Sequence, residues 1–349
     1  MVKSISLTNF RCHEAYHLDC QLDTTLILGS NGCGKTSVLE AIYILTRGKS
    51  FRATDPDIIK RGAPFYRISL EYVNGETVTA VYDGTTKTFT AYDKKSRRLP
   101  KKAKYPVVLF LPSDLNLTSG APSRRRDYFD RIFGELNDDY ATSISKYNKA
   151  LRQRNELLKA EEFIPDAFFS WNLLLARLGS TIHRYRTEYI NKINQTIGDV
   201  YRSIAKNSDT LTLKYTSELT DSTEEKYLRI LEQNLEKDHY LGHTSFGVHR
   251  DDIDFVFNGA SAEGSASRGE TRSIILALKF VESNIITRLL GRRPIVLLDD
   301  VFSELDSTRQ NCLVDNFKDN QVIITSVELR HNTHLETPPL GWQNPQNMV

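Results

Sequence analysis

The sequence predicts an α/β protein of two lobes, one of which is assembled from both ends of the chain. A glycine-rich loop at residues 29–36 separates a strand-like segment from a helix-like one. A second apolar strand, which ends in two adjacent aspartates, lies far along the chain at residues 295–300. We regard the material between them as an insertion. We therefore expect one domain of residues 1–112 with 291–349, and a mainly helical domain of residues 113–290.

The glycine-rich loop reads GSNGCGKT, and its spacing G-x-x-x-x-G-K-T is that of a phosphate-binding loop. Its glycines permit backbone conformations closed to other residues, so successive N–H groups can turn inward around an anion. Lys35, at the start of the following helix, would reach the β- and γ-phosphates of a nucleoside triphosphate, and the Thr36 hydroxyl would ligate Mg²⁺. The alternative is a glycine-rich turn that happens to contain Lys-Thr, but both flanks fit the phosphate loop. The predicted nucleotide-binding residues are Gly29, Ser30, Asn31, Gly32, Cys33, Gly34, Lys35, Thr36 and Ser37.

The segment RRPIVLLDDVFSELD, residues 292–306, is predicted to supply the second half of this site. Its apolar run is typical of a buried parallel strand, and open α/β sheets place their ligands at the carboxyl ends of such strands. Asp299 would hold Mg²⁺, and Asp300 would orient or deprotonate an attacking water. The alternative is that two aspartates merely end a strand; beside a phosphate loop we favour the functional interpretation.

The segment that starts ASRGETR at Ala266 opens a long helix, because apolar residues recur at helical spacing from Ile274 to Leu290. Ser267 and Glu270 fit a capping box, which is sufficient by itself to explain them. The same residues resemble the L-S-G-G-Q signature of ABC-type ATPases, whose serine and glycine contact the γ-phosphate bound by the opposite subunit. Both interpretations can hold. The candidate signature residues are Ser267, Arg268, Gly269 and Glu270.

The middle of the chain changes character from strands to helices. Between residues 68 and 111 short β-type runs alternate with turns, and Asn74-Gly75 and Asp83-Gly84 predict hairpins of an antiparallel flap. From about residue 123 to 236 helical patterns dominate.

Composition limits the class of protein. The 349 residues are 40% apolar and 26% charged, which are ordinary values for a globular protein. No stretch is apolar enough to predict a membrane span, and the N-terminus has no secretory pattern. The four cysteines form no C-x-x-C pair, which favours a cytoplasmic location. With a formal net charge of only +2, any nucleic-acid surface must be local.

Two stretches are candidates for such a surface, because clustered cations can replace the counterions of a phosphate backbone without reading bases. The alternatives are a solvated hairpin loop for the first stretch, and for the second a helix start that pairs with Asp127 and Asp130. Arg152 and Arg154 form a smaller cluster. To the lone His249 we assign no catalysis. The candidates are Lys94, Lys95, Arg97, Arg98, Lys101, Lys102 and Lys104, and Arg124, Arg125 and Arg126.

A chain of motifs over residues 4–326 resembles the RecF family of bacterial recombination-mediator ATPases. The matching blocks, in order, are ISLTNFRCHE, GSNGCGKTSVLEAIYILTRGKSFR, LPSDLNLTSGAPSRRRDYFD, FGVHRDD, ASRGETR and LLDDVFSELD. The resemblance implies a two-lobed ABC/SMC-type ATPase head without a long coiled coil. It implies ATP and Mg²⁺ as cofactors, an ATP-dependent homodimer, and binding to DNA at junctions of single and double strand. It further implies action with RecO and RecR to place RecA on gaps.

The resemblance also suggests residue roles and shows departures. Arg11 matches a position near the nucleotide phosphates, and Asp306 matches the dimer-contacting D-loop. Residues 37–152 contain no glutamine that could sense magnesium, and Asp114 is the candidate to replace it. Asp300 replaces the longer glutamate of ABC transporters, which favours weak hydrolysis used as a timer.

Two other functions share parts of the pattern. The main alternative is the nucleotide-binding subunit of an ABC transporter, against which the long insertion and the absent glutamine both count. A nuclease-coupled ATPase lacks a separate acidic metal cluster in the sequence. The polar segment 332–349 is predicted to be a poorly ordered tail.

Overall fold

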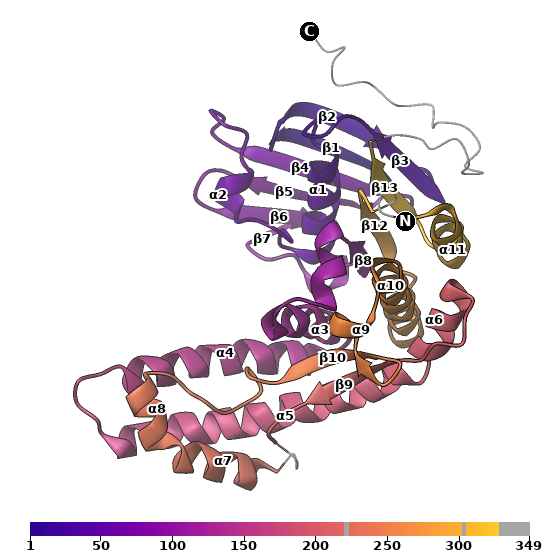
Figure 1. Cartoon of the computed structure of the whole chain (residues 1–349). Coiled ribbons are helices and arrows are strands. Elements are labelled where there is room, and N and C mark those ends of the chain that lie inside the picture. Colours follow the sequence, from indigo (N-terminus) through magenta and orange to yellow (C-terminus); the bar gives the residue numbers. More distant parts are fainter. Residues whose placement is uncertain (220–222, 302–304, 328–349) are drawn as a thin grey trace. The chain divides into compact units, whose positions relative to one another are not determined.

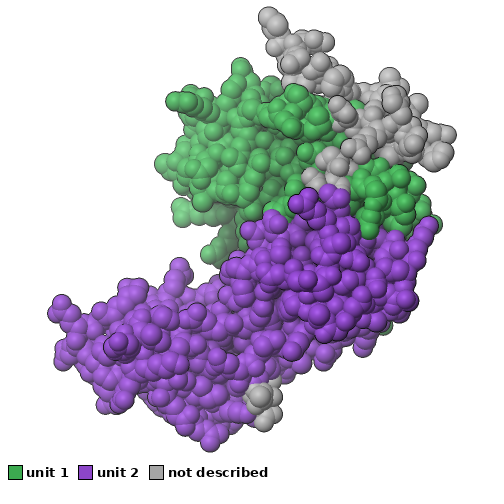
Figure 2. Space-filling view, in the orientation of Figure 1, with its two compact units in different colours: residues 1–114, 282–349 green, residues 115–281 purple. Residues whose placement is uncertain are grey.

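The computed structural model describes residues 1–219, 223–301 and 305–327, so the predicted tail lies outside the described residues. The chain divides into two compact units, residues 1–114 with 282–349 and residues 115–281 (Figure 2). The division falls within the helix α10 (Arg268–Leu290), whereas the sequence placed a domain boundary just after it. No helix in the described part of the chain is both long and apolar enough to cross a membrane.

The first unit contains a six-stranded antiparallel sheet in the order β2-β1-β4-β5-β6-β7. Side chains of β4 alternate between buried and exposed, as expected when one face of a sheet covers a core. The two predicted hairpins are confirmed: Gly75 and Gly84 take φ values of +82° and +93° in the turns that join β4 to β5 and β5 to β6. The strands are β1 (Val2–Phe10), β2 (His13–Asp19), β4 (Tyr66–Tyr72), β5 (Thr77–Tyr82), β6 (Lys87–Ala91) and β7 (Lys94–Ser96).

A second sheet of the same unit is parallel, and its strand order is β3-β13-β12-β8. The two central strands, β12 (Ile295–Asp299) and β13 (Val322–Ser326), are buried at every residue, as their continuous apolar runs predict. They pair on their outer sides with β8 (Val107–Phe110) and β3 (Thr24–Leu28). The outer strands β3 and β8, from early in the sequence, therefore flank the central strands β13 and β12, from late in the sequence.

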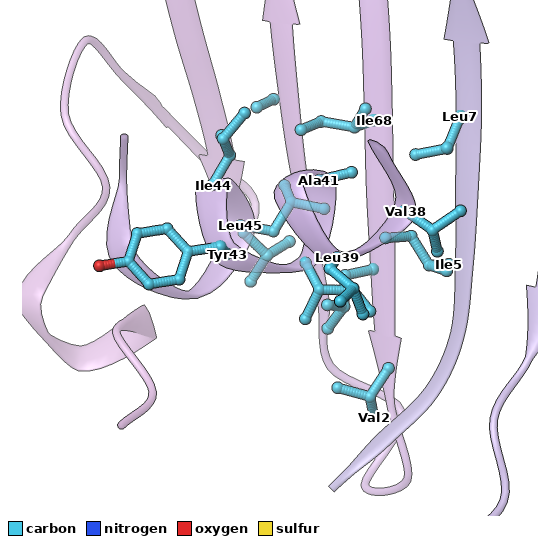
Figure 3. Close-up of a cluster of buried hydrophobic side chains, with 14 of the residues drawn as sticks. Val2, Ile5, Leu7, Val38, Leu39, Ala41, Tyr43, Ile44, Leu45 and Ile68 are labelled. Atoms are coloured by element: carbon cyan, nitrogen blue, oxygen red, sulfur yellow. The ribbon is translucent and has the colours of Figure 1, made fainter. Parts of the chain in front are cut away.

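The helix α1 (Lys35–Arg47) joins these two sheets, because it contacts strands of both. Figure 3 shows its apolar side chains beside those of β1 and β4. Its apolar side chains Val38, Leu39 and Ile42 are at most 1% exposed and lie in one core with residues of β1, β4 and β12. Truncating such a core leucine to alanine typically costs about 2–5 kcal/mol. The core thus fixes the helix whose first turn carries Lys35 and Thr36. The unit also contains α2 (Asp55–Ile58), η1 (Lys101–Ala103) and α11 (Ser307–Phe317), and η2 (Pro112–Leu117) begins in it.

A buried glutamine ties the end of the described chain to its start. The Gln321 side chain accepts a hydrogen bond from Val2 N at 2.7 Å and donates to Val2 O at 2.6 Å. It also donates to Gln21 O at 2.8 Å. One amide therefore satisfies three backbone groups of β1 and of the segment before β3.

The second unit is mainly helical, and its long helices α4 and α5 pack side by side (Figure 1). The sequence analysis predicted none of the strands in this unit; in one of them, β9 (Leu211–Thr216), Leu211 and Leu213 are buried and Thr212 between them is exposed. Its period-two pattern is short and follows long helical patterns. The strand forms a sheet with β10 (Asp252–Phe257) and β11 (Ala260–Ser261). The helices are α3 (Pro122–Leu136), α4 (Asp138–Leu158), η3 (Pro165–Phe168), α5 (Phe169–Asn194), α6 (Ile197–Ala205), α7 (Glu224–Gln233), α8 (Leu235–Leu241), α9 (Ala262–Ser265) and most of α10.

Buried arginines cross-link these helices. Arg154 of α4 donates to Asp238, Asn172 and Thr244, each at 2.7 Å, and both Arg154 and Asp238 are fully buried. Arg186 of α5 pairs with Asp130 at 2.9 Å and also donates to the Val248 carbonyl. Because every charge here has a partner, the network is a structural element, and Arg154 is no candidate for DNA contact.

Candidate nucleotide site

The phosphate loop lies between β3 and α1, as predicted, and its glycines take conformations that other residues avoid. Gly32 and Gly34 have φ values of +84° and +100°. A Cβ atom at Gly34 would collide with the His13 ring and the Cys12 sulfur, so the position admits only glycine. The Lys35 ammonium lies over the loop and donates to Gly29 O at 2.6 Å and to Ser30 O at 3.0 Å. The loop and the N-terminus of α1 therefore offer an anion the Lys35 cation together with backbone N–H groups.

The two ends of the chain meet in a hydrogen bond between a hydroxyl and a carboxylate. Thr36 Oγ1 donates to Asp299 Oδ1 at 2.7 Å, which brings together the two residues that the sequence assigned to Mg²⁺. Thr325 of β13 also donates to Asp299 Oδ1, at 2.9 Å, and its own oxygen accepts from Asp300 N at 3.0 Å. Asp300 follows β12 with φ of +51°, a left-handed conformation that is uncommon for aspartate. Thr325 thus positions both aspartates, and sequence analysis missed it.

A buried glutamate of α1 organises the arginines of the site. Glu40 accepts two hydrogen bonds from Arg11, at 2.7 and 2.9 Å, and two from Arg52, at 2.8 and 3.0 Å. Ser50 donates to the same carboxylate at 2.6 Å. Burial alone would raise the pKa of Glu40, but these hydrogen bonds outweigh it and hold the pKa below its ordinary value. An ionised Glu40 therefore fixes two guanidinium groups at once.

The phosphate loop, the two arginines and the two aspartates line a cleft of about 460 Å³. This volume is within the range of about 300–1,000 Å³ typical of small-molecule sites. The donor set fits ATP and Mg²⁺: a glycine loop and cations suit phosphates, and a hydroxyl beside a carboxylate suits a hard divalent ion. Residues named from the sequence that line the cleft are Arg11, Asn31, Gly32, Gly34, Lys35, Thr36, Ser37, Asp299 and Asp300; lining residues not named are Cys12, Arg52, Asp57 and Ile59.

Three functional residues escaped the sequence analysis, and each had some signal. Glu40 is a charged residue inside the apolar pattern of α1, which is unusual unless it is paired. Arg52 ends a block that matches the RecF family, GSNGCGKTSVLEAIYILTRGKSFR, but the match by itself indicates no role for this arginine. Thr325 lies near the end of the mainly apolar strand β13, and nothing else in the sequence distinguishes it. Of the remaining named residues, Gly29 and Ser30 support Lys35 through their carbonyls, and Cys33 O accepts from Cys12 Sγ at 3.8 Å.

The candidate signature begins α10 with the predicted capping box. Ser267 N donates to Glu270 Oε2 at 2.6 Å, and Glu270 N donates to Ser267 Oγ at 3.3 Å. The role of these residues toward a second copy stays a prediction. Asp306 caps α11 by accepting from Arg309 N at 3.0 Å. Asp114 accepts from Leu111 N at 3.0 Å and is not among the lining residues of the cleft, and its role toward magnesium stays a prediction.

The predicted DNA-binding cations fall into two groups. The cations of residues 94–104 are exposed, although Lys94 and Lys95 belong to the strand β7 and not to a hairpin loop. Arg125 corrects the prediction: it is 4% exposed and donates two hydrogen bonds to Asp252, at 2.7 and 2.8 Å. Arg126 is half-buried and donates to the Asp251 carbonyl at 2.7 Å, whereas Arg124 is exposed. The acid that pairs with Arg125 is thus Asp252, and not the predicted Asp127 or Asp130.

The fold and the cleft define the class of protein: a P-loop ATPase head. The AAA ATPase domain family matches residues 1–290. The chain belongs to the RecF family, because it is 33% identical to the DNA replication and repair protein RecF of Agathobacter rectalis, over 94% of this chain and 92% of that relative. RecF of Streptococcus suis is likewise 33% identical, over 95% and 93%.

Solved structures agree with this membership. The recombination mediator protein RecF with ATP, from the RecFOR pathway, superposes with a TM-score of 0.85 at 27% identity, over 95% of this chain and 92% of that one. The Smc head domain of Pyrococcus furiosus has a TM-score of 0.51 at 16% identity, over 94% and 89%, and supports the fold alone. The predicted ABC/SMC-type head fold is therefore confirmed, and the family favours the repair function over the transporter subunit.

Proposed function

We propose that this chain is an ATP-dependent recombination mediator of DNA repair. In this proposal it binds ATP with Mg²⁺, dimerises around two nucleotides and binds DNA. It then acts with RecO and RecR to help place RecA on gaps. The observation that carries the proposal is the hydrogen bond between Thr36 and Asp299, which completes a nucleotide cleft from both ends of the chain. Support also comes from relatives named as DNA replication and repair proteins and from a solved relative that holds ATP.

Each part of the cleft has a role in nucleotide binding. The backbone N–H groups of the loop and the Lys35 ammonium neutralise phosphate oxygens, while Glu40 holds Arg11 and Arg52 at the edge of the cleft. Thr36 and Asp299 would hold Mg²⁺, whose charge stabilises the phosphates when it is bound. Asp300, positioned through Thr325, would orient a water or accept its proton. We expect hydrolysis to be weak, as suits a switch.

Dimerisation is assigned to the start of α10. Ser267 directly precedes this long helix and Gly269 lies in its first turn, so outward N–H groups there can meet a phosphate held by a second copy. Each copy would then supply what the other lacks. The four cysteines are free, which is consistent with the proposed cytoplasmic location.

Light scattering with ATP, ADP and no nucleotide tests this proposal. We expect dimers only with ATP, no ATP binding in Lys35→Ala, and ATP binding without dimerisation in Ser267→Arg. The matched control is Ser203→Arg, an exposed serine of α6, which should dimerise normally. A Ser267→Arg variant that still forms ATP-dependent dimers would contradict the signature assignment. A wild-type protein that binds ATP but neither dimerises nor is retained by DNA would contradict the function.

A further inference from the structure

A second cavity of about 460 Å³ lies in the antiparallel part of the first unit. It is bordered by the hairpin that joins β4 and β5, by the end of β6 and by the lysine-rich segment that follows β7. None of its lining residues belongs to the nucleotide cleft. It is therefore a separate site, and the function proposed above leaves it unexplained.

Three tyrosines form the aromatic part of this cavity. The rings of Tyr72 and Tyr105 stack with centroids 5.9 Å apart. Tyr92 is 46% exposed, and its hydroxyl donates to the Lys102 carbonyl at 3.1 Å. A large aromatic ring that is held in place yet left half in solvent is a ready stacking surface.

The backbone at Tyr92 is costly to maintain. Tyr92 and Asp93 form the two-residue turn between β6 and β7 with φ values of +53° and +57°. Glycine and asparagine normally occupy such turns, and a bulky residue there is uncommon. The strained turn projects an aromatic side chain from the hairpin end, and strain of this kind is often associated with a functional site.

The polar groups of the cavity select the chemistry of its ligand. The Tyr72 residue is 7% exposed, and its hydroxyl has no hydrogen-bond partner among the described residues. This hydroxyl is buried beneath the cavity surface, and the burial raises the pKa of Tyr72, so it stays protonated. Lys102, Lys104 and Arg292 also line the cavity, with Glu76 as its single acid. Cations around aromatic faces suit a ligand that is both anionic and flat.

We propose that this cavity binds one unpaired nucleotide of single-stranded DNA. The base lies against the Tyr92 ring, and the flanking phosphates meet Lys102 and Arg292. The volume admits a nucleotide but no base pair within a duplex. This inference rests on the proposed function that the chain binds DNA, and it adds a site that distinguishes single from double strand.

The test combines affinity and crosslinking on the full chain. Fluorescence anisotropy with labelled oligo(dT) should show that Tyr92→Ala weakens binding by about tenfold, the typical effect of losing one stacked base. Tyr92→Phe, which keeps the ring, should bind like wild type. Tyr240→Ala is the matched control, because Tyr240 is 90% exposed and belongs to the other unit. Blunt duplex DNA and ATP should bind equally well to all these variants.

Oligo(dT) carrying one 5-iodouracil locates the contact, since light crosslinks this base to a stacked aromatic side chain. Mass spectrometry should find the crosslink on Tyr92, Tyr72 or Tyr105. Wild-type affinity in Tyr92→Ala, or a crosslink that maps elsewhere, would overturn the site while duplex binding leaves the proposed function standing. A wild-type protein that binds neither single-stranded nor duplex DNA would overturn both.

Discussion

Arginine–carboxylate pairs occur in both units, but in different surroundings. In the nucleotide cleft, Arg11 and Arg52 share Glu40, and their side chains keep 22% and 37% of their surface exposed. In the helical unit, the side chains of Arg154 and Asp238 are both fully buried. The same chemical pair thus stands at the edge of a cleft in one unit and inside a core in the other.

The two kinds of arginine differ in whether their N–H donors are available to a ligand. Arg154 uses four of its five N–H donors on Asp238, Asn172, Thr244 and the Leu231 carbonyl, and its side chain is fully buried, so it is not available to a ligand. Arg11 and Arg52 are oriented by Glu40 but border an open cleft. A buried pair holds helices together, whereas a half-exposed pair holds a cation ready for an anionic ligand.

The largest effect is expected from breaking the buried pair. Arg154→Met should lower the free energy of unfolding by about 3–5 kcal/mol, because it leaves the Asp238 charge buried and uncompensated. Urea denaturation measures this. Arg152→Met is the matched control two positions away; its side chain is exposed, so its effect should stay within about 0.5 kcal/mol. Adding Asp238→Asn to Arg154→Met should recover part of the loss; equal costs for Arg152→Met and Arg154→Met would remove the distinction between exposed and buried arginines.

A smaller effect should follow from protonation of His249 beside the same network. Its Nδ1 accepts from Tyr147 and its Nε2 donates to Thr244 O, an arrangement that suits the neutral ring. Burial lowers the pKa of His249 from 6.5 to about 4. Between these values the unfolded chain binds a proton that the folded chain does not. The contribution of neutral His249 to the free energy of unfolding should therefore be fully present above pH 6.5. The free energy of unfolding should fall by an amount on the order of 2 kcal/mol as the pH decreases toward 4.

His249→Gln provides the comparison, because its amide can replace both hydrogen bonds without binding a proton. Urea titrations of the two proteins over the same pH range should show a shallower loss of stability in the variant. Identical pH profiles would mean that His249 is already charged in the folded state or is more accessible than its partners indicate.

The smallest change in stability is expected at the cleft. Arg52→Met should alter the free energy of unfolding by about 1 kcal/mol or less, because the arginine is partly exposed and Glu40 keeps Arg11. It should nevertheless weaken ATP binding severalfold, which titration with a fluorescent ATP analogue measures. If Arg52→Met loses stability but keeps its ATP affinity, Arg52 stabilises the fold as Arg154 does and does not bind the nucleotide.

How far the sequence predicts the molecule depends on how local each signal is. The phosphate loop, the capping box at Ser267 and the glycine hairpins depend on neighbours along the chain, and the structure contains all of them. Arg125 and Arg154 were wrongly grouped with surface cations, because a helix sequence does not reveal which partner waits across the core.

The residues of the nucleotide site also divide into those that local motifs predict and those that depend on tertiary contacts. Thr36 and Asp299 could be paired from motif order, since each motif is specific and their combination is known in P-loop proteins. Glu40 and Thr325 could not, because their partners come from segments that only the tertiary fold brings together. The strand β9 escaped for a further reason: its 6 residues follow long helical patterns.

The strand order β3-β13-β12-β8 has a consequence for how the protein emerges from the ribosome. The helical unit is continuous in sequence, so it can begin to fold while translation continues. The parallel sheet cannot close until its two central strands have been translated, and the amide of Gln321 arrives with them. Nascent chains that stop before β12 therefore expose the inner edges of β3 and β8 and are expected to need protection from aggregation.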